Sequence, residues 1–257
     1  MGLETGFEER VRAGEYFSGL RIPPGMWAVL RLDGRSFHRV CTQLGAKRPY
    51  DESLRDRMVA AMRAVIEELG GVFGCTHSDE ISVAHRPDWD CFDRRVEKVV
   101  SVAAGVASVE FARGLPVDAP RAAFDARVWI GATLDDVQDY FRWRQSDAGR
   151  CAINAWVYWT MRAEGMSADR ATQEADRRGF AWKNEWLFQR GINFDALPAW
   201  QKRGAAAYWE RYEKAGTDPR TGATVTATRR RLATDLDLPL KEKYAQLVAQ
   251  VCRVPAG

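Results

Sequence analysis

THSDEIS, from Thr76 to Ser82, sets Asp79 and Glu80 side by side at the start of an alternating run. Val72–Cys75 before it and Ile81–His85 after it have the character of short strands, so the stretch predicts a hairpin turn. Adjacent acids repel one another unless a cation meets them. That cation can be a solvent counter-ion, a basic side chain or a metal ion, and the rest of the chain has to distinguish these.

The hairpin lies within a longer alternation of strands and helices. Strands are predicted at Trp27–Leu32, Val72–Cys75, Ile81–His85 and Ala126–Ile130, and helices at Asp51–Leu69 and Asp90–Phe111. The order β-α-β-β-α-β is that of the ferredoxin-like arrangement, an antiparallel sheet with helices on one face. We therefore expect an α+β fold.

The C-terminal half has a different pattern. From Asp135 through Tyr212 the spacing is mostly helical, with breaks near three glycines. Glu213–Thr226 is a Gly- and Thr-rich loop or hairpin. Arg229–Val251 combines a basic run with a short last helix.

The predicted topology brings remote acids together. The third strand lies between the first two and runs antiparallel to the first, so the end of strand one and the start of strand three meet at one rim. Asp33 follows the first strand, whereas Asp79 and Glu80 precede the third. Acids held together usually share a cation, and Mg²⁺ takes one or two carboxylates plus phosphate oxygens. Gly34, without a Cβ, would let its carbonyl approach as well. A plain turn beside solvated acids is the alternative.

Basic residues surround this predicted rim. Arg31, Arg35 and His38 flank Asp33 in the sequence. After the hairpin, Arg94, Arg95 and Lys98 fall within little more than one helical turn, at spacings that share a face. Such a cluster suits the phosphates of a nucleotide, and a solvated helix face is the alternative.

Composition limits the class of protein. The chain has 257 residues, is 46% hydrophobic and carries a net charge of +3, so a nucleic-acid role needs local basic clusters. Its five cysteines form no C-x-x-C pair, which argues against a zinc ribbon or disulfide framework. We see no signal peptide and no apolar run long enough to span a bilayer, and expect a cytoplasmic protein with no membrane contact.

Several stretches, taken together, resemble the tRNA-histidine guanylyltransferase family, whose members extend RNA in the 3′-to-5′ direction. The matching segments, in the family's order, are RLDGRSFH (Arg31–His38), HSDEIS (His77–Ser82), RRVEK (Arg94–Lys98), FDARV (Phe124–Val128), WRQSD (Trp143–Asp147), KNEWLF (Lys183–Phe188) and GINFDALPAWQKRG (Gly191–Gly204). The resemblance covers about Gly25 to Val251.

The resemblance implies a palm-like catalytic core in residues 1–133, with a helical part, 134–257, packed on it for RNA contacts. Asp33 and Asp79 would be catalytic and would hold two Mg²⁺ ions with the Gly34 carbonyl, and Glu80 would be accessory. The implied triphosphate-binding residues are Arg31, Arg35, Ser36, Phe37, His38, Arg48, Ser78, Arg94, Arg95 and Lys98. The implied RNA 5′-end residues are Arg127, Arg144, Asp147, Asn154, Lys183, Asn184 and Glu185.

The same resemblance implies a reaction and its partners. A tRNA 5′-phosphate would be activated with ATP, after which GTP or another nucleoside triphosphate would be added. The enzyme would be a homo-tetramer, as family relatives are. Arg150–Ala155 lacks the H-I-N-N stretch of eukaryotic members, and the end of the chain resembles the bacterial and archaeal branch. These departures favour template-directed repair of truncated tRNA 5′ ends.

Further RNA contacts are expected outside the core. The candidates are Arg229–Arg231, Lys202–Arg203 and the stretch Trp182–Arg190, where aromatic and basic residues alternate. Two alternatives remain open: a nucleotidyltransferase that acts on a free nucleotide or small molecule, and a metal-binding regulatory protein without catalysis.

Overall fold

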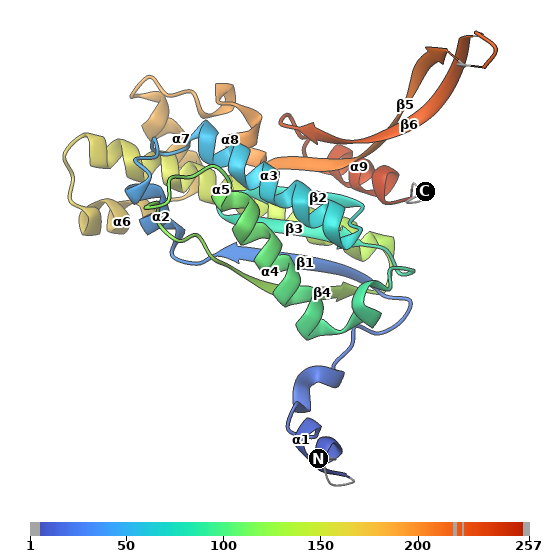
Figure 1. Cartoon of the computed structure of the whole chain (residues 1–257). Coiled ribbons are helices and arrows are strands. Elements are labelled where there is room, and N and C mark those ends of the chain that lie inside the picture. Colours follow the sequence, from blue (N-terminus) through green and yellow to red (C-terminus); the bar gives the residue numbers. More distant parts are fainter. Residues whose placement is uncertain (1–5, 218–219, 223, 254–257) are drawn as a thin grey trace.

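The computed structural model describes residues 6–217, 220–222 and 224–253, which form one antiparallel sheet flanked by helices (Figure 1). The strand order is β4-β1-β3-β2-β5-β6. The strands are β1 (Trp27–Gly34), β2 (Phe73–His77), β3 (Glu80–His85), β4 (Phe124–Gly131), β5 (Ala205–Thr217) and β6 (Thr224–Asp235). The expected α+β fold, with β3 between β1 and β2, is therefore confirmed.

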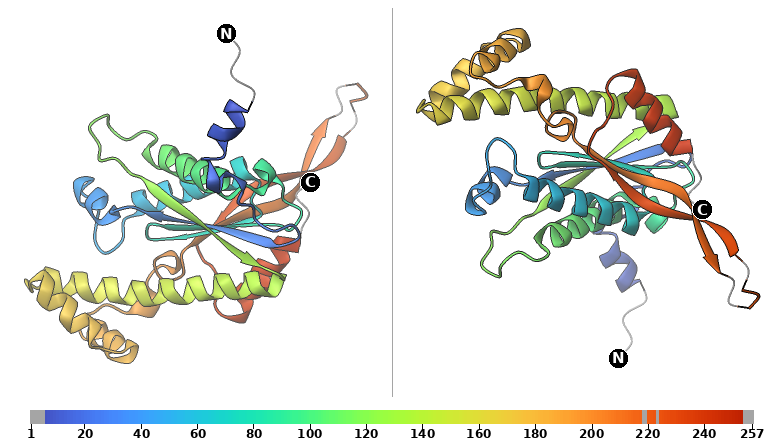
Figure 2. Two further views of the ribbon diagram at one scale, coloured as in Figure 1. Left: turned by 90° about the horizontal axis from the view of Figure 1, so that it is seen from below. Right: turned by 90° about the horizontal axis from the view of Figure 1, so that it is seen from above.

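Helices cover both faces of the sheet (Figure 2). The helices α3 (Glu52–Leu69) and α4 (Val96–Ala112) pack on one face, and α5 (Leu134–Ala163) and α9 (Glu242–Arg253) pack on the other. The shorter helices are α1 (Phe7–Arg12), α2 (Phe37–Gln43), α6 (Ala168–Asp176), α7 (Phe180–Phe188) and α8 (Ala199–Arg203), with 3₁₀ turns η1 (Tyr16–Gly19), η2 (Cys91–Arg94) and η3 (Phe194–Ala196). No helix in the described ranges is long and apolar enough to cross a membrane.

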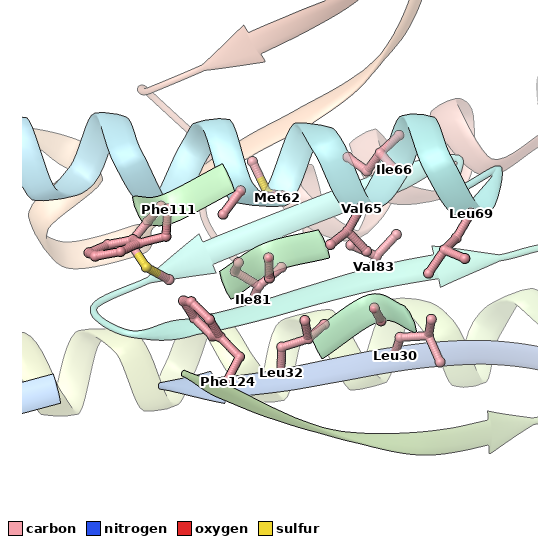
Figure 3. Packing of buried hydrophobic residues seen from close by; sticks show 14 of the residues in the cluster. Leu30, Leu32, Met62, Val65, Ile66, Leu69, Ile81, Val83, Phe111 and Phe124 are labelled. Carbon is pink, nitrogen blue, oxygen red and sulfur yellow. The ribbon is translucent and has the colours of Figure 1, made fainter. Parts of the chain in front are cut away.

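The main core lies between the sheet and the pair α3 and α4 (Figure 3). Leu30 and Leu32 alternate along β1 and face this layer, where they join Ile66 of α3 and Phe111 of α4. The intervening residues of β1 face α5 instead. The alternation therefore sends Asp33, two residues beyond Arg31, to the α5 side of the sheet.

Two predictions of secondary structure from the sequence are wrong. Ala205–Tyr212 is a strand and not the end of the helical half, because Ala205 to Tyr208 pair with β2 and tertiary pairing outweighs the helix propensity of alanine. The helix expected from Asp90 begins only at Val96, since Phe92, Asp93 and Arg94 adopt positive φ angles of 52°, 53° and 58°.

Candidate functional site

The two acids expected to meet do lie together. Asp33 stands opposite Glu80 of β3 and opposite Asp125 of β4. The Gly34 N–H donates to the Asp79 carbonyl at 3.0 Å, which ties the end of β1 to the hairpin. Burial raises the pKa of Asp79, and the nearby Asp33 carboxylate raises it further. Segments 46 positions apart thus form one acidic rim.

Glu80 has its own cation. Arg144 of α5 donates to both carboxylate oxygens, from Nε at 2.7 Å and from Nη2 at 2.6 Å. Arg144 also contacts Asp147 at 3.0 Å, and Asp147 pairs with Arg150. The side chains of Arg144 and Glu80 are only 13% and 19% exposed, so this ion pair is shielded from water. Glu80 is therefore neutralised by α5.

Asp33 and Asp79 are not balanced in this way. Asp125, the other neighbour of Asp33, pairs with Arg127 at 3.1 Å. Among the described residues no basic side chain forms an ion pair with Asp33 or Asp79. Two unpaired carboxylates in a partly buried site repel one another, and a divalent cation is the ligand that removes the repulsion.

The donor set fits Mg²⁺ that is completed by substrate. No group of three or more Cys, His, Asp or Glu side chains in the described part of the chain could hold a metal unaided. Mg²⁺ needs fewer protein ligands, because it keeps waters and binds phosphate oxygens. Gly34 is required where it stands, since a Cβ there would lie 2.4 Å from the Phe37 ring. Asp33, Asp79 and the Gly34 carbonyl are the available oxygen donors.

A cavity of about 270 Å³ opens beside the acids. Its walls come from α2, the loop 47–51, the start of α3 and Trp200 of α8. Lys47, Arg48 and Arg55 bring positive charge, and the Arg55 guanidinium lies 4.7 Å from the Trp200 ring centre. A second cavity, of about 230 Å³, contains Asp33 and Glu80. The two cavities share His77, Ser78 and Asp79, so Asp79 stands where they meet.

The first metal motif lies around these cavities. His38 and Phe37 both line the larger one, and the Phe37 ring is buried against Phe111 and Phe124. Arg35 and Ser36 are exposed at the start of α2. Arg31 lies on the same face as Asp33, and its buried Nε lacks a hydrogen-bond partner in the described residues. Its guanidinium lies 5.9 Å from the Trp143 ring centre.

The expected role of Arg94 as a phosphate ligand is wrong. Its guanidinium is buried and donates to five backbone carbonyls. The acceptors are Ile22, Pro23, Met26, Pro87 and Trp89, at 2.7 to 3.2 Å. Every N–H of the side chain is used, so Arg94 holds the segment before β1 against the loop after β3.

Arg95 and Lys98 lie at this same far end of the sheet. The Val96 N–H bonds to the Leu20 carbonyl, and Arg21 bridges to Arg95. The six residue steps of β1 from Trp27 to Asp33 span about 20 Å at ~3.3 Å per residue. These residues line neither cavity beside the acids. The expectation that this cluster surrounds the chain's own acidic rim is therefore wrong.

The residues expected at the RNA 5′ end are mostly engaged with protein groups. Buried Lys183 donates to Asn154 Oδ1 at 2.6 Å, and burial lowers the pKa of Lys183. Asn184 is half-buried, and exposed Glu185 accepts from Gln189. Arg144 pairs with both Glu80 and Asp147, and Arg127 pairs with Asp125. Lys183 and Asn154 are neighbours, as one shared site would require.

The basic candidates further along the chain divide into buried and exposed groups. Lys202 is buried and donates to the Phe194 and Asp195 carbonyls, so it is a structural residue and the RNA contact expected of it is wrong. The stretch Arg229–Arg231 lies exposed on β6, with Arg230 stacked on Trp209.

Sequence reasoning missed several residues of the site. Asp125 lies opposite Asp33 across β1 and β4. It is two residues from Arg127 in a strand, and this spacing predicts that the two side chains share a face of the sheet. Tyr50 reaches the cavities from the loop 47–51, Trp200 from α8 and Cys151 from α5. No local pattern marks those three, because tertiary packing alone brings them there.

Comparisons with known proteins agree with this arrangement. A model described as tRNAHis guanylyltransferase matches residues 8–131, and a model of the Thg1 C-terminal domain matches residues 135–248. A probable tRNA(His) guanylyltransferase of Drosophila melanogaster is 33% identical over 71% of this chain and 67% of its own length. A Neurospora crassa tRNA(His) guanylyltransferase is 30% identical over 72% and 67%.

Solved structures cover more of the chain. A bacterial tRNA(His) guanylyltransferase (Thg1)-like protein in complex with ATP has a TM-score of 0.75 and 25% identity, over 96% of this chain and 99% of that one. Such a protein in complex with GTP has a TM-score of 0.71 and 25% identity, over 97% and 100%. The Saccharomyces cerevisiae enzyme shares the fold, with a TM-score of 0.68 and 21% identity, over 76% and 90%.

Proposed function

The chain belongs to the tRNAHis guanylyltransferase family, and we propose that this nucleotidyltransferase adds nucleotides to tRNA 5′ ends in the 3′-to-5′ direction. The observation that carries the proposal is the meeting of Asp33 and Asp79, without ion-pair partners in the described residues, in a cavity that adjoins a larger one through Asp79. This is the arrangement that phosphoryl transfer with divalent ions needs.

The proposed reaction has two displacements at phosphorus. An oxygen of the RNA 5′-phosphate attacks the α-phosphorus of ATP, and pyrophosphate leaves. The 3′-hydroxyl of GTP or another nucleoside triphosphate then attacks that 5′-phosphate, loses its proton to solvent, and expels AMP. Asp33, Asp79 and the Gly34 carbonyl would hold two Mg²⁺ ions, which supply charge neutralisation and a lowered pKa at the attacking hydroxyl.

The chain's own side chains position the substrates. Lys47, Arg48 and Arg55 line the larger cavity, where Lys47 and Arg48 can neutralise a triphosphate, whereas Arg55 already pairs with Asp56 at 2.8 Å. Arg55 is oriented by its contact with Trp200. The clamp of Arg144 on Glu80 keeps a third carboxylate away from the shared cation site. Catalysis then rests on orientation and electrostatics and not on a covalent protein intermediate.

We further propose that the substrate is a tRNA with a truncated 5′ end and that addition is templated. Two features support this choice: Arg150–Ala155 lacks the histidine of the eukaryotic motif, and the bacterial Thg1-like structures cover nearly the whole chain. The hairpin of β5 and β6 gives an RNA surface, since Arg230 and Arg211 stand opposite one another. Contacts between this hairpin and RNA phosphates would make RNA binding weaken as the salt concentration rises.

One assay tests the proposal. The protein is incubated with Mg²⁺, ATP, labelled GTP and a 5′-truncated tRNA, and product length is followed. We expect growth at the 5′ end that follows the opposite strand of the acceptor stem. Labelled small-molecule product, with no extended RNA, would instead support an enzyme acting on free nucleotides, and binding without turnover would contradict catalysis.

Variants connect that assay to the site. Asp33→Asn and Asp79→Asn should each lower nucleotide addition by about 1000-fold, because each removes a carboxylate from the proposed cation site. Asp125→Asn is the matched control: it lies in the same row as Asp33 but already pairs with Arg127, and its activity should stay within about 3-fold of wild type. Full activity in Asp33→Asn would remove this carboxylate from the mechanism.

A further inference from the structure

One histidine that the proposed reaction does not use lies where the two cavities meet. His77 ends β2, two residues before Asp79, and lines both cavities. Its Nε2 lies 3.0 Å from the backbone carbonyl oxygen of Gln201 in α8 and 3.3 Å from the hydroxyl oxygen of Tyr50. A single ring nitrogen therefore joins three segments that are remote in the sequence: the loop 47–51, the end of β2, and α8.

The partners of this nitrogen determine where the hydrogens lie. A carbonyl oxygen can only accept, so the contact with Gln201 requires a hydrogen on Nε2 of His77. A protonated Nε2 has no lone pair with which to accept a hydrogen bond from Tyr50. The Tyr50 oxygen therefore accepts weakly from the same N–H at 3.3 Å, and the hydroxyl hydrogen of Tyr50 has to point elsewhere.

This hydroxyl hydrogen has no acceptor in the part of the chain that the structure describes, since His77 is the one hydrogen-bond partner found there for the Tyr50 hydroxyl. Burial raises the pKa of Tyr50 above its ordinary value, so the hydroxyl keeps its proton. The side chain is half-buried and lines the larger cavity. A half-buried donor without an acceptor is costly, and a ligand in the cavity can satisfy it.

The Tyr50 ring is held in one orientation. The ring of Trp200 lies edge-on to it, with centres 5.8 Å apart and an angle of 85°, and the His77 ring centre is also 5.8 Å away. Gln201 is itself fixed, because its side-chain Oε1 accepts from the Trp156 indole N–H at 3.2 Å. The donor is therefore oriented before a ligand arrives, which lowers the entropic cost of binding.

The other hydroxyl groups that line the larger cavity already have partners. The Thr76 hydroxyl donates to the Glu80 carbonyl at 2.8 Å. The Ser78 hydroxyl bonds to the Asp79 carboxylate and helps to lower the pKa of that acid, against the larger effect of burial. Among the hydroxyl groups of the described residues in this cavity, that of Tyr50 is the one left to donate to a ligand.

We propose that the Tyr50 hydroxyl donates to a phosphate oxygen of the nucleoside triphosphate, and that His77 is the positioning residue that turns the hydroxyl hydrogen toward it. This role rests on the proposed function, which supplies the triphosphate. A phosphate oxygen is the expected acceptor because Lys47 and Arg48 lie in the same loop and Asp79 is two residues from His77. Positive side chains beside a cation site are where the charged part of a nucleotide binds.

The test is calorimetric titration of non-hydrolysable analogues of ATP and of GTP, with Mg²⁺, into the full chain. Tyr50→Phe keeps the ring but removes the donor, so it should weaken both analogues by about 10-fold while leaving the melting temperature unchanged. Tyr158→Phe, the same change on α5 outside both cavities, is the matched control and should bind as wild type does. Unchanged affinity in Tyr50→Phe would overturn the proposal, and so would a loss for one analogue alone, which would place the hydroxyl at the base.

Two changes at His77 test its positioning role. His77→Gln keeps an N–H donor for the Gln201 carbonyl and should retain most of the affinity, whereas His77→Leu removes that donor and should lose about 10-fold. In the Tyr50→Phe background His77→Leu should cost nothing more, because no hydroxyl hydrogen remains to be oriented. Losses that add would show that His77 acts independently of Tyr50.

The same titrations separate this role from the proposed function. A wild-type chain that binds neither analogue would contradict both. Binding by wild type that Tyr50→Phe leaves unchanged would contradict the role of Tyr50 and leave the proposed reaction standing.

Discussion

The two ends of β1 hold charge in opposite ways. At one end Arg94 is buried beside Met26, and all of its N–H groups reach carbonyl oxygens. At the other end Asp33 faces Asp79 without a basic partner in the described residues, and burial together with this proximity raises the pKa of Asp79. One end is electrostatically satisfied and the other is not.

This difference separates structure from function within one strand. A buried charge whose hydrogen bonds are complete stabilises the fold and has nothing left to offer a ligand. Paired acids without a counter-charge cost stability and persist where a ligand supplies the missing charge. In the sequence RLDG and DRR both combine arginine with aspartate, and only the partners of each side chain distinguish their roles.

The largest effect is expected at the satisfied end. Arg94→Met leaves five backbone carbonyls without their donor and should lower the free energy of unfolding by about 3 kcal/mol or more. Lys98→Met, an exposed change nearby on α4, should cost about 0.5 kcal/mol or less. Denaturant unfolding of both variants checks this, and equal losses would show that Arg94 is not the structural centre of that end.

A smaller effect on stability is expected at the ion pair between Glu80 and Arg144, beside the acidic rim. Glu80→Gln and Arg144→Met each break the paired contact, so the two changes should not add. A double-mutant cycle on unfolding should give a coupling free energy of about 1 to 2 kcal/mol for this shielded pair. Additive losses would mean that α5 does not hold Glu80 through Arg144.

The end of the sheet that contains Arg94 also predicts a pH dependence of stability, through the buried His85. His85 lies beside Trp89, and burial lowers the pKa of His85 from 6.5 to about 3. Below pH 6.5 the unfolded state therefore binds a proton that the folded state does not. Stability from this group is complete above pH 6.5 and falls by about 1.4 kcal/mol per pH unit down to about pH 3.

His85→Leu removes this titration. The unfolding free energy of the wild type, minus that of the variant, should fall steadily between pH 7 and pH 4, because only the wild type loses the contribution of His85. A constant difference over that range would show that His85 titrates normally in the folded chain.

The sequence was sufficient for the features that depend on strand order. The spacing of Asp33 and Asp79 relative to their strands predicted the acidic rim, because antiparallel topology determines which strand ends meet. The helix Glu52–Leu69 was predicted well, since Asp51 caps its start and Gly70 ends it.

The sequence was insufficient where long-range partners decide. Arg94 was read as a free cation because no local pattern shows that carbonyls from residues 22–26 and 87–89 surround it. The RNA contact expected of Lys202 fails for the same reason, because tertiary packing buries this side chain. Ala205–Tyr212 became a strand because β2 offered an open edge, which helix propensity cannot report.

The most direct test is calorimetric titration of Mg²⁺, in the presence of a non-hydrolysable ATP analogue, into wild type, Asp33→Asn, Asp79→Asn and the double variant. If the two carboxylates hold the proposed Mg²⁺ ions jointly, each single variant should lose about as much affinity as the double variant. Unchanged affinity in either single variant, or losses that simply add, would contradict a shared site.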